Sequence, residues 1–242
     1  MNNKKHIYIS HGNKGGTGKS FLAVMIGSIY ELYDIPFLLI DTDANQVGGQ
    51  PDVGPRFERS SKAQVVYAPL TGEDSAEDLL AELFEIIENY RGEHIILNTP
   101  AGASEQLERV GELIGMTCSD LEIDIHVFYN VFNSTLAVKQ AEDLLTGSIA
   151  RYATDYYIVK NKFFGLPQLT PALEKLPCFT LPIIHSNVID RLNQNENFAQ
   201  ILSTLPAFQR AQLSQAFTNL ANNGFLTALN IINNNNNNNN NN

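Results

Sequence analysis

The segment "HGNKGGTGKS", residues 11 to 20, has the residue types and spacing of a loop that binds phosphate groups. Glycines have no Cβ, so several backbone N–H groups can approach a polyphosphate, and a following helix adds its positive N-terminal end. Lys19 would reach the β- and γ-phosphates, and the Ser20 hydroxyl would ligate Mg²⁺. A glycine-rich turn with an exposed lysine is the alternative. The residues expected to contact the nucleotide here are Gly15, Gly16, Thr17, Gly18, Lys19, Ser20 and Phe21.

A second lysine, Lys14, lies inside the glycine run, and Asn13 occupies the position where such loops usually begin with glycine. With these residues the segment resembles the deviant Walker A box, KGGxGK[ST], of the MinD/ParA family of ATPases. The resemblance implies a nucleotide-sandwich dimer in which Lys14 reaches the partner's phosphates and acts in catalysis. A cation supplied in this way neutralises charge in the transition state, so hydrolysis would wait for dimerisation. A solvated surface lysine is the alternative.

Two acidic residues in "DTDANQ" (41–46) follow a short apolar run, at the place where a strand is expected to end. The segment resembles DxDxxQ of the same family. The resemblance implies that Asp43 is a catalytic residue that positions the attacking water, and that Asp41 supports the metal side. Two loop acids that cap the end of a strand are the alternative.

The segment "NTPAG" (98–102) resembles the switch segment D-[ST]-P-[AP]-G of this family, but Asn98 replaces the aspartate. An amide oxygen can accept a hydrogen bond from a Mg²⁺-bound water, yet it carries no charge. Hydrogen bonds to charged groups contribute about 1.5–3 kcal/mol, against about 0.5–1.5 kcal/mol for neutral ones. We therefore expect Asn98 on the metal side, with weak metal affinity and slow turnover but intact nucleotide binding.

Two later segments match the parts of the family that hold the base. In "VKNKFFG" (159–165), Asn161 matches the asparagine that recognises adenine, since its amide offers the purine edge a donor and an acceptor. "LPIIHSNVIDRL" (181–192) resembles a loop that packs on the base, with Pro182 and Ile183 as apolar contacts. Each match is weak alone, because an asparagine after a strand is more often a turn residue.

Short apolar runs alternate with amphipathic segments, which is typical of βαβ units and a mainly parallel sheet. We expect an α/β fold, a three-layer P-loop NTPase with a doubly wound sheet, as one ATPase domain over 1–232. Ten asparagines (233–242) predict a disordered tail. The expected strands are 6–10, 36–41, the start of 94–102, 122–130, 155–161 and 178–182. One expected helix begins at Lys19, and others cover 75–90, 134–146 and the chain from Val188. A loop is expected over 44–62.

Charge and composition limit the classes of partner. A net charge of −10 and a pI near 4.9 argue against a broad basic surface for nucleic acid, so charge does not indicate DNA contact, although a small basic patch is left open. The sequence contains no run of about 18 consecutive apolar residues, so it predicts no transmembrane helix. Residues 211–232 lack the lysines and arginines of a helix that lies on a membrane surface, so stable membrane insertion is not expected. Cys118 and Cys178 have no metal-ligand spacing and indicate reduced thiols in a cytoplasmic protein.

These features predict a protein that binds ATP with Mg²⁺, forms a homodimer with ATP and hydrolyses it slowly. The resemblance is nearest to plasmid partition and conjugal-transfer members of the StbB/TraL type. It implies a role in plasmid partition, conjugal transfer or positioning of a cellular cargo, with a partner protein of that system. The alternative is a non-hydrolysing, nucleotide-gated adaptor or scaffold, which Asn98 favours and which Lys14 and Asp43 oppose.

Overall fold

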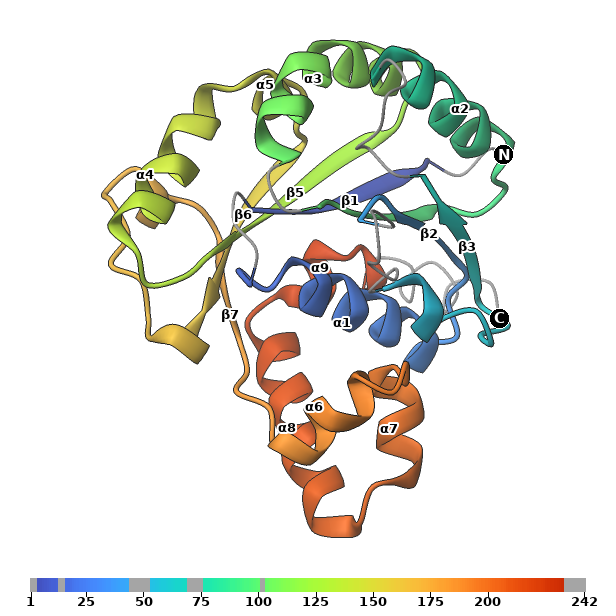
Figure 1. Ribbon diagram of the computed structural model, residues 1–242, viewed down its shortest axis with the longest axis vertical. Coiled ribbons are helices and arrows are strands. Elements are labelled where there is room, and N and C mark those ends of the chain that lie inside the picture. The colour runs from blue at the N-terminus through green and yellow to red at the C-terminus, as the bar shows by residue number, and fades with distance from the viewer. Residues whose placement is uncertain (1–3, 13–15, 44–52, 69–75, 101–102, 233–242) are drawn as a thin grey trace.

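The computed structural model describes residues 4–12, 16–43, 53–68, 76–100 and 103–232. In these ranges seven strands form one sheet in the order β3-β2-β4-β1-β5-β6-β7, and every pairing between them is parallel (Figure 1). The α/β P-loop NTPase fold expected from the sequence is therefore confirmed. The strands are β1 (His6–His11), β2 (Phe37–Asp41), β3 (Ala63–Tyr67), β4 (His94–Asn98), β5 (Asp124–Val131), β6 (Asp155–Asn161) and β7 (Cys178–Leu181).

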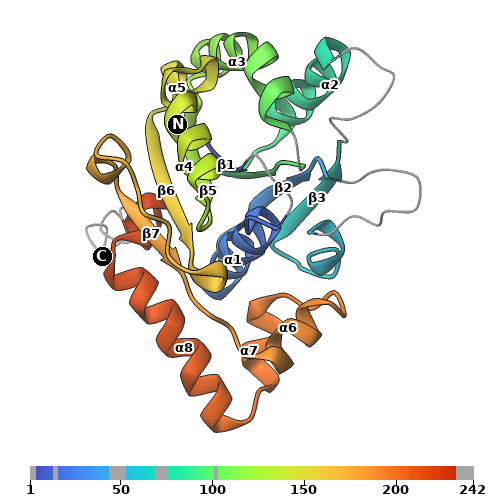
Figure 2. The ribbon, with the colours of Figure 1, turned by 60° about the vertical axis from the view of Figure 1, so that its left-hand side comes forward.

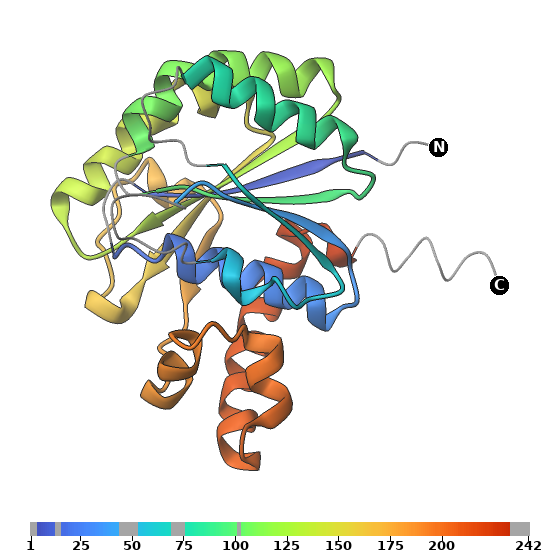
Figure 3. The ribbon, with the colours of Figure 1, turned by 45° about the vertical axis from the view of Figure 1, so that its right-hand side comes forward.

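Helices cover both faces of the sheet, which explains why β2 and β4 are buried along their whole length and apolar at all positions except Asp41, His94 and Asn98 (Figure 3). The α-helices are α1 (Lys19–Leu32), α2 (Ala76–Asn89), α3 (Ala103–Asp120), α4 (Thr135–Asp143), α5 (Ser148–Tyr152), α6 (Ser186–Leu192), α7 (Phe198–Thr204), α8 (Ala207–Asn222) and α9 (Phe225–Ala228). Short 3₁₀ turns are η1 (Gly54–Arg56), η2 (Leu144–Thr146), η3 (Lys162–Phe164) and η4 (Leu173–Lys175).

Alternate residues of β1 point into two separate cores. Ile7 and Ile9 face the core under α2, α3 and α5, whereas Tyr8 faces the core under α1 and α6–α9. Helices α6, α7 and α8 project below the sheet beside α1 (Figure 2). Residues 211–232 pack on this second core through Leu213, Leu220, Phe225 and Leu229. No helix of the described residues is both long and apolar enough to cross a membrane.

The structure adds elements that the sequence analysis did not assign, chiefly strand β3 and helix α3. The stripe Leu107, Val110, Ile114 and Cys118 buries one face of α3 at helical spacing. A loop was expected over 44–62. In the part of this segment that the structure describes, Val53 and Phe57 are instead fully buried in the core beside α1. Residue 75, where the expected helix over 75–90 begins, lies outside the described residues.

Candidate nucleotide-binding site

The glycine loop leads from β1 into α1, and its backbone explains two of its glycines. Gly16 and Gly18 have φ values of 75° and 107°, in the left-handed region that favours glycine. A Cβ on Gly18 would also lie 3.0 Å from Nδ2 of Asn161, so a side chain there would require the Asn161 amide to shift. Gly18 is the N-cap of α1, which places the positive end of that helix at the loop. Lys14 and Gly15 lie outside the described residues.

Lys19, the first residue of α1, carries an ammonium group in a buried position. The residue is only 5% exposed, and burial lowers the pKa of its side chain, an effect that the carboxylate of Asp43 opposes. Ser10 fixes the backbone at this point by donating a 2.9 Å hydrogen bond to the carbonyl of Lys19. A buried cation at a helix N-terminus, next to the sheet edge, is a strong attractor for an anionic ligand.

Asp41 and Asn98 lie side by side at the carboxyl ends of β2 and β4, where the strand register pairs them directly. Asn98 Nδ2 donates a 3.0 Å hydrogen bond to Oδ1 of Asp41. The other oxygen of Asp41 accepts from the backbone N–H groups of Val53 (3.0 Å) and Gly54 (2.9 Å). Asp41 is thus fully buried and anchors the turn that follows residue 52.

One atom of this pair fits a hydrated cation. Oδ1 of Asn98 is buried and has no hydrogen-bond partner among the described residues. Such an orphaned acceptor is costly unless something donates to it. A Mg²⁺-bound water is a donor of that kind, so the residues present fit the metal that the sequence predicts at this edge of the sheet.

A cavity of about 490 Å³ opens between the start of α1 and the β7–α6 connection. It brings together most of the residues expected from the sequence, from the phosphate loop to the base-binding segments. They are Gly16, Gly18, Lys19, Ser20, Phe21, Asp43, Asn161, Pro182 and Ile183. Its volume suits a nucleotide-sized ligand. Thr17, Asp41 and Asn98 are buried behind this lining rather than part of it.

Asn161 has a structural role that the sequence did not reveal. Its Nδ2 donates to the carbonyl of Thr17 (3.0 Å), and its Oδ1 accepts from the N–H of Phe163 (3.0 Å). The side chain therefore clamps the glycine loop to the end of β6. Recognition of a purine would use the second Nδ2 proton and the second lone pair of Oδ1.

Two further residues belong to the site and were missed by sequence reasoning. Asn130, near the end of β5, donates to the carbonyl of His11 (3.0 Å) and so holds the chain where it enters the glycine loop. Phe163 lines the cavity and is 72% exposed, which is unusual for a ring of this size. The aromatic pair in "NKFFG" was the only available signal for Phe163, and the only signal for Asn130 was its place at the end of the expected strand 122–130.

The sheet topology and the glycine loop together identify the P-loop NTPase fold. Comparison with known proteins supports this fold class. No family model matches the chain. Solved structures similar to it include the septum site-determining protein MinD with Mg-ADP from Pyrococcus horikoshii OT3 (TM-score 0.55, 14% identity, 90% of this chain and 95% of that one) and the MinD cell division protein of Aquifex aeolicus (TM-score 0.50, 19% identity, 85% and 93%). Protein MobD of Acidithiobacillus ferrooxidans is 22% identical over 226 residues, covering 87% of this chain and 92% of that protein. At these identities the likeness shows a MinD-like fold.

Proposed function

We propose that this protein binds ATP with Mg²⁺ in the cavity beside the glycine loop, and that Lys19 is its main phosphate ligand. The observation that carries the proposal is the burial of the Lys19 ammonium at the N-terminus of α1, on the wall of a cavity of about 490 Å³. The similar MinD structure from Pyrococcus horikoshii holds Mg-ADP, which supports the same ligand class here.

We assign roles to the surrounding residues as part of this proposal. The Ser20 hydroxyl and Oδ1 of Asn98 would hold Mg²⁺ and its waters, with Asp41 keeping the Asn98 amide in place. The metal would supply positive charge to the phosphates. Asp43 would orient a water for attack, while Pro182 and Ile183 would pack on the base that Asn161 reads.

We further propose that ATP joins two copies of the chain and that hydrolysis, carried by Lys14 of each copy across the seam, is slow. By resemblance the cycle would serve plasmid partition, conjugal transfer or the positioning of a cellular cargo, together with a partner protein. A non-hydrolysing adaptor is the second candidate. It is favoured by the Asn98–Asp41 hydrogen bond, because an amide stands where the resembled pattern has a second carboxylate.

The nucleotide proposal is tested by titrating a fluorescent ATP analogue into the wild type, a Lys19→Ala variant and a Lys175→Ala variant. Lys175 is exposed in η4 and serves as the charge-matched control. We expect Lys19→Ala to bind at least about 100-fold more weakly, since charge-assisted contacts to phosphate contribute several kcal/mol together, and the control to bind as the wild type. Equal affinity in all three proteins would contradict the assignment of the phosphate loop.

A further inference from the structure

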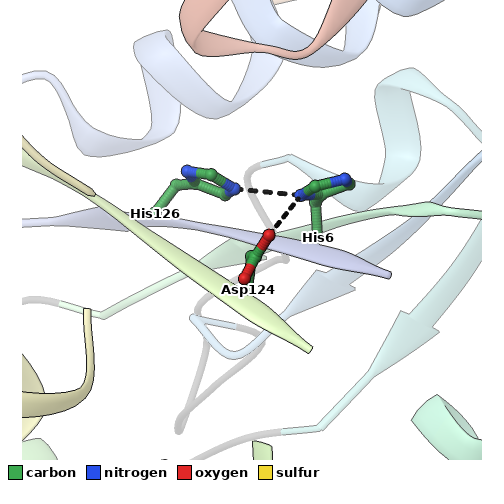
Figure 4. Close-up of side chains that lie close together, drawn as sticks. All are labelled: His6, Asp124 and His126. Carbon is green, nitrogen blue, oxygen red and sulfur yellow. Dashed lines mark hydrogen bonds and ion pairs between the residues drawn. The ribbon is translucent and has the colours of Figure 1, made fainter. Parts of the chain in front are cut away.

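At the edge of the sheet opposite the nucleotide site, three potential metal ligands lie at the start of β1 and β5. His6 begins β1, Asp124 begins β5, and His126 is two residues further along β5. The register pairs His6 with Asp124 and Tyr8 with His126. Paired residues, and residues two apart on one strand, share a face of the sheet, so all three side chains point toward the same space (Figure 4).

The spacing of the ligand atoms matches a small tetrahedral ion. Nδ1 of His6 lies 3.1 Å from Nε2 of His126 and 3.6 Å from Oδ2 of Asp124, and the three atoms all lie within 4.8 Å of one another. Around Zn²⁺, with bonds of about 2.0–2.2 Å to nitrogen and oxygen, tetrahedral ligand atoms are about 3.3–3.5 Å apart. An ion could therefore enter with small shifts of the side chains.

The hydrogen bonds around the three residues hold their ligand atoms toward one centre. His126 donates its Nδ1 proton to Asp155 Oδ2 at 2.9 Å, which turns its Nε2 toward His6 Nδ1. The Asn230 amide Nδ2 lies 3.2 Å from the Tyr8 hydroxyl and 3.3 Å from His6 Nδ1. The 3.1 Å hydrogen bond between His6 Nδ1 and His126 Nε2 needs one proton, and a cation that replaced this proton would be held by both nitrogens and by the carboxylate oxygen of Asp124.

The surroundings leave the ligand atoms of the cluster accessible. Lys4 contacts the other oxygen of Asp124, Oδ1, at 2.7 Å and leaves Oδ2 facing His6. The side chains of His6 and Asp124 are 15% and 19% exposed, so the centre can be reached from solvent.

We propose that His6, Asp124 and His126 bind one Zn²⁺ ion, and that Asp155 orients His126 as an outer-shell partner. Two imidazoles and one carboxylate are ligands that zinc favours, and a carboxylate behind a ligating histidine is the usual support of such sites. The ion would join β1 to β5 at the edge of the sheet far from the glycine loop, which follows the other end of β1. Its binding needs no nucleotide.

The test is calorimetric titration of ZnCl₂ into the full-length, chelator-stripped protein without nucleotide and with excess MgCl₂, which occupies sites of hard oxygen ligands. We expect one Zn²⁺ per chain. Asp124→Asn and His126→Gln should each weaken binding by more than about 100-fold, and Asp155→Asn by about 10–100-fold through loss of the outer-shell bond. His185→Gln removes an exposed histidine elsewhere and should bind as the wild type. Absence of saturable uptake, or equal uptake by all variants, would overturn the proposal.

A second measurement on the wild type guards against variants that fail to fold. Imidazole NMR signals recorded during the ZnCl₂ titration should shift for His6 and His126 and stay unchanged for His185. If no imidazole signal moves, or if His185 moves while the pair does not, the cluster is a hydrogen-bonded histidine pair and the metal site is wrong.

Discussion

The side-chain amide of Asn98 donates a 3.0 Å hydrogen bond to Asp41, and both residues are fully buried. An aspartate at position 98 would instead place two carboxylates in contact, an arrangement that requires a proton or a metal ion between them. With asparagine the two side chains share a hydrogen bond, so no proton or cation is needed between them. This end of the sheet can therefore form without the Mg²⁺ and nucleotide proposed above.

Asn98→Asp should accordingly make the fold depend on Mg²⁺. Without metal, we expect a loss of about 1.5–3 kcal/mol in the free energy of unfolding, because a hydrogen bond to a charged group is replaced by like-charge contact. With Mg²⁺ and ATP, stability should recover and turnover should rise if the natural protein is a slow ATPase. Urea unfolding with and without Mg²⁺-ATP, and phosphate release, measure both. A variant with unchanged metal dependence and turnover would show that residue 98 does not face the metal.

Gly18→Ala should damage the nucleotide site more than its backbone strain alone explains. The residue has φ 107°, and the added Cβ would meet Asn161 Nδ2 at 3.0 Å. Gly224→Ala is the matched control, because it has φ 85° and nothing within 4 Å of the new Cβ. Both variants should lose about 1–2 kcal/mol to left-handed strain, and only Gly18→Ala should also lose nucleotide affinity. Equal nucleotide affinity in the two variants would contradict the loop geometry.

His11 should make the fold sensitive to acid. Burial, with a smaller contribution from Lys19, lowers the pKa of His11 to about 3 from an ordinary 6.5. The unfolded chain then binds a proton that the folded chain excludes. The free energy of unfolding contributed by this group is therefore fully present above pH 6.5 and is lost as pH falls towards 3, at up to about 1.4 kcal/mol per pH unit.

The check is urea unfolding of the wild type and a His11→Phe variant between pH 6 and 4, a range that lies inside this window. Phenylalanine keeps a ring against Tyr129, whose centroid lies 5.2 Å away, but cannot titrate. The variant should show a shallower decline of stability with acid, whereas His185→Asn, at an exposed position, should keep the wild-type slope. Parallel slopes for all three proteins would mean that His11 is protonated in the folded state.

Much of the site was predictable because the carboxyl ends of parallel strands meet at one edge of a sheet. The motif order in the sequence was therefore enough to expect Lys19, Asp43 and Asn161 around one cavity. Bonds that depend on register or loop path were not predictable. Asp41 is held by Val53 and Gly54 across a segment with no periodic pattern. The His6–His126 contact joins residues 120 positions apart, and only the β1–β5 register brings them together.

The proposed ATP-gated dimer is tested most directly by light scattering of the wild type and a Lys14→Ala variant with ADP and with a non-hydrolysable ATP analogue. Lys14→Ala should keep nearly normal nucleotide binding, because Lys19 and the N–H groups of the loop remain. It should lose the dimer, because the partner's γ-phosphate then lacks a cation in a seam without water. We predict that the wild type doubles its mass with the ATP analogue alone and that the variant stays monomeric. If both proteins stay monomeric under every condition, the sandwich mechanism is contradicted and Lys14 is a solvated surface lysine.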